Sequence, residues 1–151
     1  MYLSFYGFRK HPFNLTADPG FLFPSPQHRE ALSFLQYGIA ERKGFLSITG
    51  EVGTGKTTLC RALLSRLDDR VKTAFILNSN LTESQLIHAV IEDFGIPLPG
   101  RGRMNLMRAL NAFLIAQVRE GNNAVLIIDE AQNLSAEQLE QIRMLSNLET
   151  A

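Results

Sequence analysis

The stretch GEVGTGKTT, from Gly50 to Thr58, decides the fold class of this chain. It fits the pattern Gly-x-x-x-x-Gly-Lys-Thr, which is typical of a phosphate-binding loop when it lies between a strand and a helix. Phosphate oxygens need several backbone N–H groups that converge on one point, and glycines without a Cβ permit that approach. The helix after such a loop directs its positive end at the same anion.

The motif also assigns candidate roles to individual side chains. Lys56 adds a positive charge for the β- and γ-phosphates of ATP, and the Thr57 hydroxyl is predicted to bind Mg²⁺. A Rossmann dinucleotide loop is excluded, because its third glycine or alanine would fall on Thr58. The predicted nucleotide-binding residues are Gly50, Glu51, Val52, Gly53, Thr54, Gly55, Lys56, Thr57 and Thr58.

The sequence around this loop predicts alternating strands and helices. Short apolar runs predict buried strands over residues 45–49, 71–78 and 123–130. Helical spacing and end signals predict a helix from the Ser25 cap to a stop at Gly44, and another from Lys56. Further helices are predicted after a capping box at Thr82, over residues 104–120 and after a cap at Ser135. Strands that are apolar throughout, separated by helices, predict a three-layer α/β/α fold with a parallel sheet.

A second acidic motif, AVLIIDE, ends the strand predicted over residues 123–130. Ligands gather at the carboxyl ends of parallel strands, so both carboxylates are candidates for the nucleotide site. Asp129 is predicted to hold Mg²⁺ through water, and Glu130 to polarise the attacking water as a general base. The adjacent glutamate favours an ATPase over a GTPase or a small kinase, and the GTP-reading motif Asn-Lys-x-Asp is absent from the sequence.

The composition of the chain limits the kinds of partner and cellular location that we expect for it. Fifteen basic and fifteen acidic residues cancel, so no long-range attraction to nucleic acid is expected. Arg101, Arg103 and Arg108 leave a local contact with nucleic acid or a partner open, although a solvated loop and helix start is the favoured interpretation. The one cysteine, Cys60, excludes an internal disulfide and a thiolate metal cluster. The N-terminus does not read as a signal peptide and no apolar run is long enough to span a bilayer, so the sequence predicts a soluble, intracellular chain.

Three stretches together resemble a known family. They are FYGFRKHPFNLTADPGFLFPSPQHREAL, GEVGTGKTTLCRALL and LIIDEAQNLS, and they extend the likeness over essentially the whole chain. The chain resembles AAA+ ATPases, and more narrowly the ATPase domain of the ExeA/GspA family of general secretion pathway proteins. On this view residues 1–44 form an aromatic N-terminal segment and a helix, and residues 45–151 form a P-loop core.

The resemblance implies further roles. Asn78 would contact Glu130 and gate its orientation, unless it serves only as a turn former. Phe8, Pro12 and Phe13 would lie beside the adenine, unless they form only an aromatic strap over the core. A ring-shaped homo-oligomer is implied, because a neighbour's arginine completes each AAA+ site. The family also implies a cytoplasmic ATPase at the inner membrane of a bacterium, working with an inner-membrane partner to place a secretin.

The resemblance also predicts what the chain lacks. Family members continue into a strand with a polar sensor, an arginine finger and a helical lid. We therefore expect either a fragment truncated before them, whose sheet lacks its central strand and leaves unpaired backbone edges, or a domain that closes in another way. Two other functions stay open: a DNA-associated ATPase regulator similar to transposition helpers, and a nucleotide-dependent interaction module with little turnover.

Overall fold

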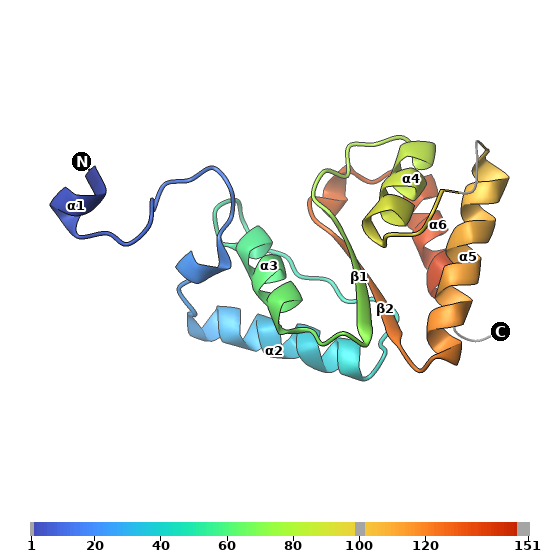
Figure 1. The fold of residues 1–151 in the computed structure, drawn as a ribbon, viewed down its shortest axis with the longest axis horizontal. Coiled ribbons are helices and arrows are strands. Elements are labelled where there is room, and N and C mark those ends of the chain that lie inside the picture. Colours follow the sequence, from blue (N-terminus) through green and yellow to red (C-terminus); the bar gives the residue numbers. More distant parts are fainter. Residues whose placement is uncertain (1, 99–101, 148–151) are drawn as a thin grey trace. The chain divides into compact units, whose positions relative to one another are not determined.

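The computed structural model describes residues 2–98 and 102–147 and divides the chain into two compact units (Figure 1). The unit that contains the glycine-rich loop is called the loop unit, and the unit that contains the β-sheet is called the sheet unit. The loop unit comprises Met1–Tyr37 and Ser47–Arg66, and the sheet unit comprises Gly38–Leu46 and Leu67–Ala151. The predicted division at residue 44 stays a prediction.

The loop unit is built from helices and an extended N-terminal segment. Its elements are α1 (Tyr2–Tyr6), the short 3₁₀ helix η1 (Pro19–Phe21), most of α2 (Pro26–Ala40) and α3 (Lys56–Arg66). The most deeply buried apolar side chains of this unit are Leu32 on α2 and Leu59, Ala62 and Leu63 on α3. Helix α3, which follows the glycine-rich loop, is therefore anchored by its apolar face. It also contacts η1.

Both ends of α2 have a local cause. The predicted cap is confirmed, because the Ser25 hydroxyl accepts the backbone N–H of His28 at 3.2 Å. The helix ends at Ala40, before the predicted stop at Gly44, because Arg42 adopts a left-handed conformation with φ 52°. A non-glycine residue with positive φ breaks the helical ladder at that point.

The sheet unit contains a parallel pair of strands, as the sequence predicts. Strand β1 (Val71–Ile76) pairs with β2 (Asn123–Ile128), in a register that sets Val71 beside Asn123 and Ile76 beside Ile128. The prediction of a strand over residues 45–49 is wrong, since that segment has no regular secondary structure. A strand is held by hydrogen bonds to a neighbour, and among residues 2–98 and 102–147 the ladder joins only β1 and β2. Apolar, β-prone composition does not supply that neighbour.

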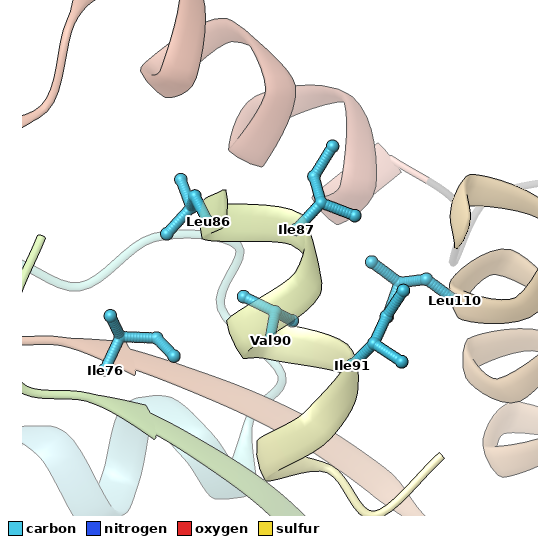
Figure 2. Packing of buried hydrophobic residues seen from close by; sticks show 6 residues of the cluster. All are labelled: Ile76, Leu86, Ile87, Val90, Ile91 and Leu110. Atoms are coloured by element: carbon cyan, nitrogen blue, oxygen red, sulfur yellow. The ribbon is translucent and has the colours of Figure 1, made fainter. Parts of the chain in front are cut away.

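Helices α4 (Glu83–Asp93), α5 (Arg103–Arg119) and α6 (Ala136–Ser146) complete the sheet unit. Thr82 and Ser135 cap α4 and α6, as predicted. Both caps are capping boxes, a feature that the sequence predicts for Thr82 alone. Figure 2 shows the buried core, in which α4 turns one apolar face toward β1 and α5. The cluster consists of Ile76, Leu86, Ile87, Val90, Ile91 and Leu110. This core fixes the strand ends, where the acidic motif lies.

Candidate functional site

The glycine-rich loop has the backbone shape that its motif predicts. Gly53 and Gly55 have φ values of +80° and +91°, which side-chain-bearing residues rarely adopt. Helix α3 begins directly afterwards at Lys56, and the N–H of Leu59 donates to the Gly55 carbonyl at 2.8 Å. The N-terminal N–H groups of α3 therefore lie at the end of the loop, where an anion is favoured.

Side chains hold the loop across its width. The Lys56 ammonium donates to the carbonyls of Gly50 at 2.7 Å and Glu51 at 2.6 Å. The Thr54 hydroxyl donates to the same Glu51 carbonyl at 2.8 Å. A Cβ at Gly50 would lie 3.0 Å from the Thr54 hydroxyl oxygen, so the first glycine of the motif leaves room for this closure. The loop is thus stabilised by residues of its own motif.

A cavity of about 340 Å³ adjoins the loop within the same unit. Pro12, one of the residues that the resemblance sets beside the adenine, lines this cavity, and its contact with a base stays a prediction. Phe8 and Phe13 do not line it, because Phe8 packs against Tyr2 and Tyr6 and Phe13 is 84% exposed. Its lining residues are His11, Pro12, Asn14, Thr16, Ala17, Asp18, Phe21, Leu22, Phe23, His28, Gly53, Thr54, Gly55 and Thr58.

Asp18 contributes a carboxylate to the wall of this cavity. The Gly20 N–H that donates to it at 2.8 Å, and then the Lys10 ammonium at 3.5 Å, hold the pKa of the Asp18 carboxyl below its ordinary value. Because the side chain caps η1, its charge also orders the segment that forms one side of the cavity. This part of the cavity wall is therefore held by the cap of η1.

The acidic motif lies just beyond the end of β2. The Asp129 N–H donates to the Ile76 carbonyl at 2.9 Å, which continues the ladder one step past the strand. Glu130 then turns into a left-handed conformation, with φ 55° and ψ 40°, and its N–H donates to an Asp129 carboxylate oxygen at 2.9 Å. A non-glycine residue in that region is strained, and such strain is common at functional sites.

Ser79 is a residue of this site that the sequence analysis missed. Its side chain is fully buried, and its hydroxyl donates to the Glu130 carbonyl at 2.5 Å. This contact holds the left-handed turn from the neighbouring strand end, 51 residues away in the sequence. The available signal was the short polar run Asn78-Ser79-Asn80 at the end of an apolar strand.

Asn78 is placed at the same strand end, and its side chain makes a local turn. Its Oδ1 accepts the backbone N–H of Asn80 at 3.0 Å, which is the turn-forming role weighed for it. The Glu130 carboxylate accepts a hydrogen bond from the Gln132 side-chain amide. A gating contact between Asn78 and Glu130 stays a prediction.

The two motifs belong to different units of the chain. Thr57 lies in the first turn of α3 in the loop unit, and Asp129 follows β2 in the sheet unit. Joint binding of one Mg²⁺ by these two residues stays a prediction. Of the arginines considered for a nucleic-acid contact, Arg108 is exposed, whereas Arg101 and the Arg103 side chain lie outside the described part of the chain. Within residues 2–98 and 102–147 no helix combines the length and hydropathy needed to cross a bilayer.

The parallel strands and the glycine-rich loop define the class of P-loop α/β proteins, and comparison with known proteins supports this class. The AAA domain family matches residues 39–151, so the chain belongs to this family, with its P-loop α/β fold. The chain is also similar to General secretion pathway protein A of Aeromonas hydrophila, with 42% identity over 151 residues. That alignment covers 99% of this chain and 28% of the relative, so the chain spans less than a third of that protein. No solved structure matches the chain. The resemblance stated from the sequence is thereby confirmed.

A first prediction concerns the backbone of the loop. Replacing Gly53 by alanine should lower the free energy of unfolding by roughly 1–2 kcal/mol, because a Cβ is disfavoured at its positive φ. Beyond Gly53 and its two chain neighbours, no atom lies within 4 Å of that Cβ position, so the cost would come from the backbone alone. Gly44→Ala is the matched control, since Gly44 also has open space but no left-handed φ. Equal urea unfolding curves for the two variants would contradict this account.

A second prediction concerns Ser79. Ser79→Ala leaves the Glu130 carbonyl without this donor, and should lower the free energy of unfolding by about 1–2 kcal/mol in urea titrations. Ser84→Ala removes the same hydroxyl from an exposed position on α4 and should have little effect. If Ser79→Ala were as stable as its control, the hydroxyl would not hold the turn.

Proposed function

We propose that this chain is a P-loop ATPase domain that binds Mg-ATP at Gly50–Thr58. The observation that carries the proposal is one loop with two left-handed glycines that leads into a helix N-terminus and forms the wall of a cavity. Oriented N–H groups suit the phosphates, and a partly apolar cavity with a few polar groups suits a base and ribose. Membership of the AAA domain family supports the same conclusion.

In this proposal the chain's own residues do three things for the phosphates. The loop N–H groups and the start of α3 bind the oxygens through fixed dipoles. Lys56, at the first residue of α3, supplies a charge-assisted donor. The side chains of Glu51 and Val52 lie outside this chemistry, since Val52 is fully exposed and the loop uses the carbonyl of Glu51.

For Mg²⁺ the proposed ligands are the Thr57 hydroxyl and the Asp129 carboxylate. Both are the oxygen donors that this ion prefers, so the residues fit the metal. Held by these residues, Mg²⁺ would supply positive charge that neutralises the negative charge developing on the phosphates. Glu130, whose backbone is held by Ser79, is the proposed general base that takes a proton from the attacking water.

The likeness to General secretion pathway protein A supports a wider role for the whole protein. We infer that ATP turnover energises assembly of a secretion or envelope complex, from the cytoplasmic face of the inner membrane and with a membrane partner. A homo-oligomeric ring is part of this proposal, because an AAA+ site takes an arginine from its neighbour.

The binding half of the proposal is tested with Lys56→Ala. Calorimetry with Mg-ATP should give a dissociation constant for the parent chain, and at least about a tenfold weaker one for the variant, because a charge-assisted contact is lost. Lys72→Ala, which removes an exposed lysine from β1, should bind as the parent does. A parent chain that is folded by circular dichroism but does not bind would overturn the proposal.

The hydrolytic half is tested with Glu130→Gln. This change removes the base and keeps the size of the side chain, so binding should persist while phosphate release falls by about 10²–10⁴-fold. Glu137→Gln, at an exposed position in the first turn of α6, is the control and should leave turnover unchanged. Undiminished turnover in Glu130→Gln would show that another group activates the water.

A further inference from the structure

A histidine outside the motif contacts the phosphate loop. The Nε2 of His28 lies 2.7 Å from the carbonyl oxygen of Thr54, and its Nδ1 lies 2.6 Å from the hydroxyl oxygen of Ser25. A carbonyl oxygen only accepts hydrogen bonds, so Nε2 must carry the proton. In the neutral ring Nδ1 is then an acceptor, and Ser25 donates to it. The imidazole thus joins the cap of α2 to the loop.

The Thr54 carbonyl matters because of the peptide bond to which it belongs. In a planar trans peptide the C=O of Thr54 and the N–H of Gly55 point in opposite directions. Whatever fixes the direction of this carbonyl also fixes the Gly55 N–H. That N–H belongs to the glycine-rich loop whose donors are proposed to meet phosphate.

Gly55 has reason to need such a restraint. Glycine populates positive and negative φ about equally, so the motif permits several orientations of this peptide. The His28 ring also lies close to the glycine itself, since a Cβ at Gly55 would be 3.3 Å from Nε2 and 3.7 Å from Leu22 Cδ1. Gly55 therefore meets two demands at once: a φ of +91°, and close approach of the ring.

We propose that His28 is a positioning residue for nucleotide binding, which acts by fixing the Thr54–Gly55 peptide so that the Gly55 N–H faces the phosphates. The inference rests on the proposed function, and it adds a residue 26 positions upstream of Thr54 that the motif does not contain. Ser25 is the partner that orients the ring. His28 also lines the cavity, so direct contact with the base is the competing role.

The test compares His28→Gln with His28→Asn. Both variants carry a neutral amide, but the Gln amide extends to about where Nε2 lies, whereas the shorter Asn amide reaches only about as far as Nδ1. The probes are Mg-ATP and Mg-tripolyphosphate, and calorimetry on the whole chain gives their dissociation constants. We expect His28→Gln to bind both probes within about twofold of the parent, and His28→Asn to bind both about tenfold more weakly.

Each outcome separates the alternatives. Parent-like binding by His28→Asn overturns the proposal, and so does weaker binding of Mg-ATP alone, because that result would assign His28 to the base. If the parent binds neither probe, the proposed function fails. The restraint of the Thr54–Gly55 peptide by His28 is then tested without nucleotide, by the ¹⁵N chemical shift of the Gly55 amide, which responds to hydrogen bonding at the preceding carbonyl. That chemical shift should change in His28→Asn and be largely kept in His28→Gln. An unchanged shift in both variants would overturn the proposal that His28 fixes this peptide.

Discussion

The parallel pairing of β1 with β2 is the interaction on which the sheet unit depends. Its register brings both strands to an end together, since Ile76 lies beside Ile128. The chain segments that follow the strands therefore meet, although 51 residues separate Ser79 from Glu130. A slip of one position would turn the side chains of one strand to the opposite face, and the buried core at Ile76 forbids it. The acidic motif thus takes its position from apolar packing.

Helix α6 stabilises that register further, because its Gln138 connects the segments that follow the two strands. Gln138 is buried, and its side-chain amide donates to the Leu81 carbonyl at 2.5 Å while its Oε1 accepts the N–H of Ser135. One side chain therefore completes the capping box of α6 and provides a hydrogen-bond donor for a backbone carbonyl in the segment between β1 and α4. A buried amide with both ends paired is stabilising, whereas a half-paired one would be costly. The left-handed turn at Glu130 precedes the Ser135 cap in the sequence, and the Ser79 hydroxyl bonds it to the segment that follows β1.

The sequence predicts those features whose causes are local. The helix caps at Thr82 and Ser135, the run of apolar residues in each paired strand, and the glycines of the loop all carry their signals within a few positions. The segment 45–49 fails as a strand because pairing is not a local property. Ser79 and His28 escape prediction for the same reason. Each is a single polar side chain whose partner lies far along the chain, and no periodicity marks it.

Lys56 shows how closely the fold of the loop and its chemistry are connected. Its ammonium donates to the carbonyls of Gly50 and Glu51, and these contacts hold together the loop that it is proposed to serve. A phosphate oxygen carries more negative charge than a carbonyl, so it competes for the same donors. Binding would then exchange two contacts with neutral carbonyl oxygens for contacts with charged phosphate oxygens, and only the difference would appear as affinity. Because Thr54 and His28 also contact the loop backbone, Lys56 would be able to make that exchange without the loop opening.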